Sequence, residues 1–142
     1  MSNDSWVVGI GNNHAYLGRA YVTLKSHKGS LSELSSREWD SFQQIIKILE
    51  KAYSDAFGAK PLNWGCFMNH AFREKPFNPH VHWHIYPRYE IAPEIEGMKF
   101  SDELFGNFYD DTAERIVDQT VVDQIADTLR KHIDKVQLSE KF

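Results

Sequence analysis

The sequence predicts an α+β fold in which helices cover an antiparallel sheet. Two observations carry this prediction: several short segments alternate apolar with polar side chains, and one long segment repeats apolar residues at helical spacing. The 142 residues are 42% hydrophobic and 13% aromatic, which is enough for one core and excludes wholesale disorder. Because the chain contains no internal repeat and no long polar linker, we expect a single domain over residues 1–142.

Four segments have the length and composition of short strands. They are residues 6–10, 21–25, 62–68 and 80–86. Pro87 should end the last of them, because a proline cannot donate a hydrogen bond to a neighbouring strand. From Pro87 to Tyr109 the periodicity is weak, and we expect mostly loop there.

The clearest helix signal lies between Ser35 and Gly58. Ser35 and Glu38 fit a capping box, in which each side chain bonds the free backbone N–H of the other residue. Gly58 occupies the position of a C-terminal cap. The apolar residues at helical spacing are Trp39, Phe42, Ile45, Ile46, Leu49, Tyr53 and Phe57. One stripe of this helix should therefore pack on the sheet.

A second helix is predicted toward the C-terminus. Asp111 and Glu114 have the spacing of a helix cap, so we expect the helix to begin there. Its apolar face would be formed by Ile116, Val117, Val121, Ile125, Leu129 and Ile133.

The composition excludes several classes of protein. Sixteen Lys and Arg against 20 Asp and Glu give a net charge of −4, which offers no reason to expect nucleic-acid binding. Cys66 is the only cysteine in the sequence, which excludes an internal disulfide framework and the usual thiolate zinc finger. No apolar run approaches the length of a membrane span and residues 1–4 are polar, so we expect a cytoplasmic protein that binds no membrane.

Three histidines alternate with apolar residues at the end of the last predicted strand. Because successive side chains of a strand point to opposite faces, His80, His82 and His84 should share one face. This row has three interpretations. It could be the polar face of a half-exposed strand, or a metal site that uses two of the histidines and a third ligand such as His70. It could also be a catalytic row, in which one histidine attacks while its neighbours orient and protonate.

The segment from His80 to Tyr86 resembles the His-x-His-x-His-x-x signature of the histidine triad (HIT) superfamily, where x is hydrophobic. Asn69 precedes His80 by eleven residues, where members of that family carry an Asn or Gln that contacts the substrate phosphates. Residues 17–22 resemble the family's Pro-Gly-His strand entry. The resemblance covers residues 6–90 and leaves residues 91–142 as a loop and a C-terminal helix. It implies a HIT-like sheet of about five strands, covered by one long central helix and the C-terminal helix.

This resemblance implies nucleotidyl chemistry. His82 would attack the α-phosphate of a nucleotide and form a covalent nucleotidyl-histidine, which water then hydrolyses. His84 would contact phosphate oxygens and help to protonate the leaving group, while His80 would orient the site by hydrogen bonding. Asn69 would stabilise the charge that develops on the phosphoryl oxygens.

The chain also departs from the family pattern. Residues 73–79 contain two prolines and no glycine where many members have a Gly-Gln-Ser/Thr-type phosphate loop. Arg19 stands where a fourth histidine often appears, and a cation there would suit a polyphosphate. Asn13 lies near the expected ribose or base pocket, although turn formation explains it equally well.

We therefore expect a hydrolase of a dinucleoside polyphosphate, such as a diadenosine polyphosphate, or of a nucleoside phosphoramidate. The expected catalytic residues are His80, His82 and His84, and the expected substrate-binding residues are Arg19, Asn13 and Asn69. The resemblance implies a homodimer, and we expect neither a cofactor nor a metal. The alternatives are a nucleotide-binding protein with little or no turnover and a metal-binding module.

Overall fold

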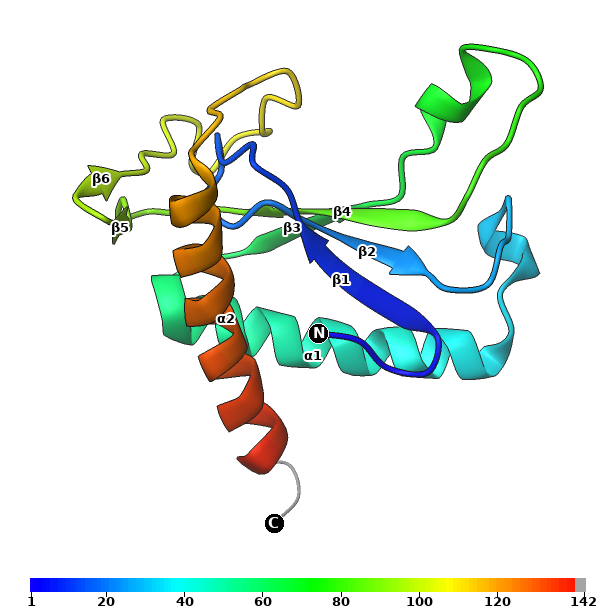
Figure 1. Cartoon of the computed structure of the whole chain (residues 1–142), viewed down its shortest axis with the longest axis horizontal. Helices are drawn as coiled ribbons and strands as arrows, with labels where there is room; N and C mark the ends of the chain where they lie inside the picture. The colour runs from blue at the N-terminus through cyan, green and yellow to red at the C-terminus, as the bar shows by residue number, and fades with distance from the viewer. Residues whose placement is uncertain (140–142) are drawn as a thin grey trace.

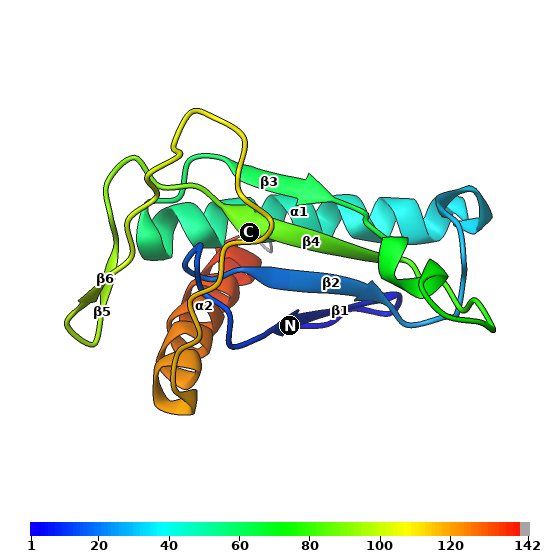
Figure 2. The same ribbon diagram turned by 90° about the horizontal axis from the view of Figure 1, so that it is seen from above.

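The computed structural model describes residues 1–139. It has the predicted α+β architecture, a four-stranded antiparallel sheet in the order β1-β2-β4-β3 with helix α1 packed beneath it (Figure 1). The sheet consists of β1 (Trp6–Ile10), β2 (Ala20–Leu24), β3 (Leu62–Gly65) and β4 (His82–Pro87). A separate hairpin consists of β5 (Glu94–Ile95) and β6 (Met98–Lys99), and the long helices are α1 (Ser36–Phe57) and α2 (Gln119–Ser139). Viewed from above, α2 crosses the half of α1 that leads to its C-terminus (Figure 2).

Helix α1 begins and ends where the sequence predicts. The Ser35 hydroxyl accepts a hydrogen bond from the Glu38 backbone at 3.3 Å, and the Glu38 carboxylate accepts one from the Ser35 backbone at 2.7 Å. Gly58 ends the helix in the left-handed conformation, with φ of 72°, which a residue without a Cβ adopts at little cost.

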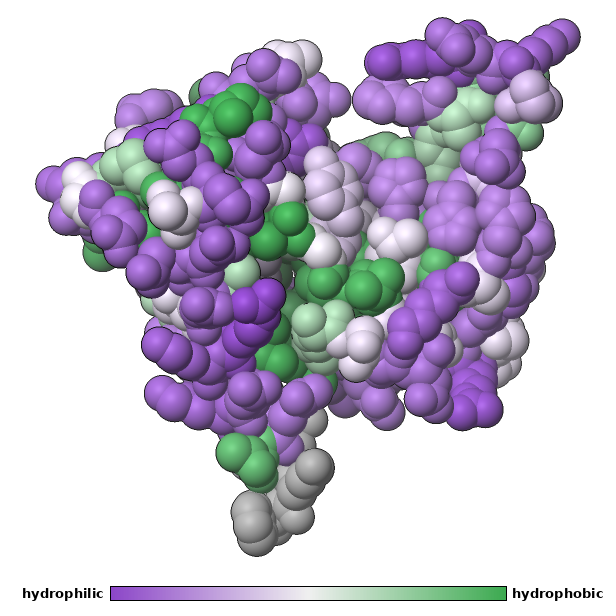
Figure 3. Space-filling model, viewed as in Figure 1, coloured by the Kyte–Doolittle hydropathy of each residue, from purple (hydrophilic) through white to green (hydrophobic). Residues whose placement is uncertain are grey.

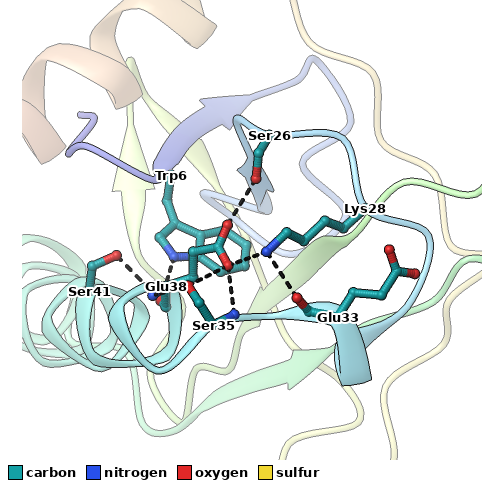
Figure 4. A network of polar contacts seen from close by, with 7 residues as sticks. All are labelled: Trp6, Ser26, Lys28, Glu33, Ser35, Glu38 and Ser41. Atoms are coloured by element: carbon teal, nitrogen blue, oxygen red, sulfur yellow. Dashed lines mark hydrogen bonds and ion pairs between the residues drawn. The ribbon is translucent and has the colours of Figure 1, made fainter.

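The Glu38 carboxylate also joins the helix to the loop that follows β2 (Figure 4). The Lys28 ammonium donates to it at 2.5 Å and the Ser26 hydroxyl donates to it at 2.9 Å. Lys28, followed by Ser35, lowers the pKa of Glu38 to about 2. The indole N–H of Trp6 donates to the Glu38 carbonyl at 2.9 Å, so β1 is joined to the same helical turn.

The core lies between the sheet and α1, with α2 closing one side. Phe42 of α1 stacks on Trp83 of β4 with ring centroids 4.9 Å apart, and it contacts the Trp6 ring at the same distance. Ile85 and Ile45 are completely buried in this layer. Strand β4 therefore presents Trp83 and Ile85 to α1, and its other face is left for the histidines.

The C-terminal helix begins later than predicted. It starts at Gln119 instead of near Asp111, so Ile116 and Val117 lie outside its apolar face, and Ile116 is 61% exposed. The segment before the helix is extended and pairs with the turn after β1. The Arg115 carbonyl accepts from the His14 backbone at 2.8 Å, and the Val117 backbone donates to Asn12 at 3.0 Å. These tertiary hydrogen bonds outweigh the local capping signal.

The strand boundaries differ from the predicted ones by a few residues. Strand β3 ends at Gly65 instead of Met68, and a short 3-10 turn (Asn69–Phe72) follows it. The stretch from Pro87 to Tyr109 is mostly loop, as predicted, apart from the β5–β6 hairpin. Across residues 1–139, no helix combines the length and the apolar content that a membrane crossing requires.

A buried ion pair anchors the loop between the hairpin and α2. The Arg88 guanidinium donates to both carboxylate oxygens of Asp102, at 2.7 and 3.0 Å, and these side chains are only 3% and 2% exposed. Arg88 also donates to the carbonyls of Asn107 at 2.7 Å and Leu104 at 2.6 Å. The end of β4 thus holds the segment that contains residues 102–107.

We predict that Asp102→Ala lowers the free energy of unfolding by about 3–5 kcal/mol, because it leaves the buried Arg88 guanidinium without its counter-charge. The measurement is urea denaturation followed by circular dichroism. Asp127→Ala is the matched control, because it removes the exposed ion pair with Arg130 and should cost less than about 1 kcal/mol. Equal losses in both variants would contradict the assigned role of the buried pair.

Candidate functional site

The predicted row of histidines lies on one wall of a pocket of about 430 Å³, above the face of the sheet that α1 does not cover. His82 and His84 belong to β4, a central strand that pairs with β2 on one side and β3 on the other. His80 lies two residues before this strand. The space-filling view shows the hollow above the sheet, between the arm of residues 66–79 and the loop of residues 101–113 (Figure 3).

A backbone carbonyl determines the protonation of His82. The Nδ1 atom of His82 lies 2.8 Å from the His80 carbonyl oxygen. Because a carbonyl can only accept, we infer that Nδ1 carries the proton and that the Nε2 atom of the neutral ring has the free lone pair. The Nε2 atoms of His82 and His84 lie 3.1 Å apart, so the Nε2–H group of His84 donates to the Nε2 lone pair of His82. The nitrogen of His82 that carries the lone pair therefore faces His84.

His84 is neutral in the free protein. Burial, followed by the charges of His82 and Arg19, lowers the pKa of His84 to about 4. Its Nδ1 atom is buried and has no hydrogen-bond partner within residues 1–139. The ring is therefore uncharged at neutral pH, with its proton on the nitrogen that faces His82.

His27 also contacts the histidine row, although no periodic pattern in the sequence predicts it there. His80 Nε2 donates to the Leu24 carbonyl at 2.7 Å, which leaves His80 Nδ1 as an acceptor. Nδ1 of His27 lies 2.9 Å from that atom, and the two rings are stacked. The loop after β2 thus brings together two histidines that are 53 residues apart in the chain.

Arg19 supplies a positive charge beside Tyr86, at the end of the pocket away from His80. Its guanidinium donates to the Tyr86 hydroxyl at 2.9 Å and lies over the Tyr86 ring, 4.6 Å from the centroid. Its Nε–H is buried and has no partner within residues 1–139, and no carboxylate there lies within ion-pair distance of it. A guanidinium with free donors at a pocket wall suits a phosphate.

The arm of residues 66–79 forms the wall on the His80 side. Asn69 lies in the 3-10 turn of this arm and lines the pocket, as do His70 and Asn78. The sequence indicates His70 only as a candidate metal ligand, and it does not predict Asn78 at the site. Of residues 73–79, the segment in which the chain departs from the family pattern, Asn78 lines the pocket, whereas residues 73–77 are exposed and do not line it.

Asn13 is placed differently from the other predicted residues. Its side-chain oxygen accepts from the backbones of Ala15 and Arg115, each at 3.1 Å, and its amide nitrogen donates to the Ala113 carbonyl at 3.2 Å. Asn13 is absent from the residues that line the pocket within the described chain. Its amide stabilises a turn and ties the segment before α2 to that turn.

One acidic residue, Asp111, lines the pocket at the Tyr86 end. It arrives on the segment that the sequence indicated as the start of a helix. Among the described residues, no group of three or more His, Cys, Asp or Glu side chains has the arrangement of a metal site. The wall thus contains four imidazoles, one guanidinium and one carboxylate, together with amides and aromatic rings.

We predict that stability falls as the pH is lowered from 7 to 5.5. The pKa of His84 is lowered from 6.5 to about 4 on folding, so in this range the unfolded chain binds a proton that the folded chain does not. In urea titrations, His84→Asn should reduce the slope by a fraction of the roughly 1.4 kcal/mol per pH unit of one full proton, since solvent screens the half-buried ring.

Glu38→Gln provides the control for this pH dependence. The pKa of Glu38 is lowered from 4.5 to about 2, so its contribution to stability is present at pH 5.5 and is lost only as the pH falls below 4.5. This variant should keep the wild-type slope between pH 7 and 5.5. A slope that is unaffected by His84→Asn would contradict the neutral state assigned to that ring.

Comparison with known proteins identifies the fold. No family model and no curated protein matches the sequence. Among solved structures, a hypothetical histidine triad nucleotide-binding protein from Sulfolobus tokodaii is 16% identical with a TM-score of 0.67, over 96% of this chain and 83% of that one. A zinc-bound histidine triad family protein from Mycobacterium smegmatis is 14% identical with a TM-score of 0.61, over 98% and 85%. A uridylyltransferase is 18% identical with a TM-score of 0.64, over 95% of this chain but 40% of that chain. This chain has the fold of the histidine triad proteins.

Proposed function

We propose that the protein is a nucleotide hydrolase that cleaves at the α-phosphate through a nucleotidyl intermediate on His82. The observation that carries the proposal is the hydrogen bond from His82 Nδ1 to the His80 carbonyl, which places the lone pair of the ring on Nε2, the atom that would attack once substrate replaces its contact with His84. A carbonyl is an uncharged acceptor, so it orients the ring without removing its proton. It also stabilises the imidazolium that forms when Nε2 bonds to phosphorus.

In the first step, the Nε2 lone pair of His82 attacks the α-phosphorus, and the bond from phosphorus to the leaving oxygen or nitrogen breaks. Binding of an anionic phosphate favours the charged form of His84 and so raises its pKa above the value in the free protein. The protonated His84 then donates its proton to the leaving group. Arg19 and Asn69 line the same pocket and would bind the phosphoryl oxygens.

In the second step, water attacks the phosphorus of the intermediate and the bond between phosphorus and Nε2 breaks. His84, now neutral, accepts the proton that the water loses, so both histidines return to their starting states. Dinucleoside polyphosphates and nucleoside phosphoramidates both satisfy this scheme, since each presents an α-phosphate with an oxygen or a nitrogen leaving group. We therefore propose one of these two classes as the substrate.

The second candidate is a nucleotide-binding protein with little or no turnover. It is favoured by the segment of residues 73–79, of which residues 73–77 are exposed and do not line the pocket. A phosphate would then be held by side chains alone, without the glycine-rich backbone cradle. The two functions differ in whether a bound nucleotide is released unchanged.

We predict that the purified protein releases AMP from diadenosine tetraphosphate or from adenosine phosphoramidate, with the products resolved by chromatography. His82→Ala should lower kcat by at least about 10³-fold, because it removes the attacking atom. His132→Ala is the matched control, since His132 lies on α2 and bonds the Thr128 carbonyl outside the pocket.

The outcomes separate the two candidate functions. Wild-type rates in His132→Ala together with loss of turnover in His82→Ala would support the proposed nucleophile. Turnover in His82→Ala within tenfold of the wild type would exclude it. Binding of both nucleotides by the wild type without AMP release would favour the binding protein.

A further inference from the structure

The phenyl ring of Phe67 belongs to the pocket wall, and the proposed mechanism gives it no role. Phe67 is 44% exposed, which is a large fraction for an apolar side chain of this size. Its ring centroid lies 5.7 Å from that of His84, with the two planes at 51°. The phenyl ring therefore lies beside the imidazole that must change its charge during the proposed reaction.

The sequence makes room for this ring at Gly65. Gly65 of β3 pairs with His84 of β4, so a side chain at position 65 would project beside His84 on the pocket face. A Cβ atom at this position would overlap the Cε2 and Cζ atoms of Phe67. The φ of Gly65 is not positive, so close approach of the phenyl ring, and not backbone conformation, accounts for a glycine here.

The phenyl ring occupies space that water would otherwise fill. Loss of contact with water is the largest cause of the lowered pKa of His84. Tyr21 and Tyr86 also flank the imidazole, with ring centroids 5.0 and 6.2 Å from it, but each carries a polar hydroxyl. Phe67 is the flanking ring that has no polar atom. It is thus well suited to keep water of the pocket away from His84.

The backbone of Phe67 acts on His84 in the opposite direction. Its carbonyl favours the charged form of the imidazole, whereas the charges of His82 and Arg19 disfavour that form, as does His70 to a smaller extent. The Nδ1 atom of His84 is buried and has no hydrogen-bond partner within residues 1–139, so it is free to take up a proton. The titratable groups around this imidazole are His82 and Tyr86 on β4, Tyr21 on β2, Arg19 before β2 and His70 on the arm of residues 66–79.

We propose that Phe67 is a positioning residue for His84. Its ring, seated on Gly65, excludes water so that the imidazole is neutral in the free protein, and its carbonyl accepts the Nδ1–H group once substrate has charged the imidazole. This inference rests on the proposed function, in which His84 gives a proton to the leaving group.

The protons balance over the two steps of the reaction. Nδ1 of His84 takes up a proton from solvent when the phosphate binds, and Nε2 passes its own proton to the leaving group. The Nε2 lone pair then accepts the proton of the attacking water. Nδ1 returns its proton to solvent when the product leaves. Through both steps the Phe67 carbonyl would hold the proton on Nδ1, so that Nε2 remains the reacting nitrogen.

The test measures the pKa of His84 by NMR titration of the ligand-free protein, together with AMP release from adenosine phosphoramidate. In Phe67→Ala, water enters beside the imidazole, so the pKa of His84 should rise from about 4 to about 5. At pH 7, kcat should fall about tenfold while KM stays within about twofold, because the proton donor is less well held. Phe67→Leu should keep most of both wild-type values, since an apolar side chain still excludes water.

Gly65→Ala tests whether the seat of the ring matters. The added Cβ displaces the phenyl ring, so this variant should reproduce both effects of Phe67→Ala. Combining the two substitutions should add nothing to Phe67→Ala alone, because both act through one ring. Phe72→Ala is the matched control, since Phe72 is a 54% exposed phenylalanine of the same arm that does not line the pocket. It should keep the wild-type pKa and kcat.

The titration and the kinetics can each overturn the inference. An unchanged pKa of His84 in Phe67→Ala, or an equal rise in Phe72→Ala, would show that the phenyl ring does not control the charge of His84. A raised pKa with unchanged kcat would exclude a part for Phe67 in the reaction. A wild type that releases no AMP would overturn the proposed function, whereas the titration of the free protein would still decide whether Phe67 keeps His84 neutral.

Discussion

The alternation of side chains along β4 is the constraint on which the site depends. Trp83 and Ile85 are held on the α1 side, where Trp83 stacks on Phe42 and Ile85 is fully buried. His82 and His84 must then face the pocket, because successive residues of a strand point to opposite faces. A shift of one residue in register would place the imidazoles in the core and the indole in the pocket. The packing of Trp83 and Ile85 in the core thereby determines that His82 and His84 face the pocket.

Backbone carbonyls on this strand and its neighbour then determine the chemistry of each ring. The His80 carbonyl holds the proton of His82 on Nδ1, and the Leu24 carbonyl holds that of His80 on Nε2. These carbonyls orient the two rings, which then contact His84 and His27 through their other nitrogens. Burial lowers the pKa of His84, so this ring is uncharged at neutral pH until an anion binds.

Local signals in the sequence were sufficient for the elements that depend on local physics. The capping box and glycine cap of α1 act within a few residues, and the alternation around His82 acts within one strand. The start of α2 was predicted wrongly because the segment from Asp111 to Asp118 is held by hydrogen bonds to residues about a hundred positions away.

The difference between local signals and long-range contacts also applies to the site residues. His82, His84, Arg19 and Asn69 were predicted from the motif and its spacing, and the structure brings all four to one pocket. The contacts of His27 and Asp111 with this site arise from loop paths that no periodicity encodes. Asn13 shows the reverse case, since a polar residue near the expected site is used entirely for tertiary hydrogen bonds.

The most direct test of the proposed mechanism is to trap the covalent intermediate. The protein would be mixed with adenosine phosphoramidate, quenched in base within a single turnover, and its peptides analysed by mass spectrometry. The proposed mechanism predicts an adenylyl group on the peptide that contains His82, attached at Nε2, because Nδ1 is bonded to the His80 carbonyl. AMP release without an adduct on His82, or with the adduct on another residue, would contradict it.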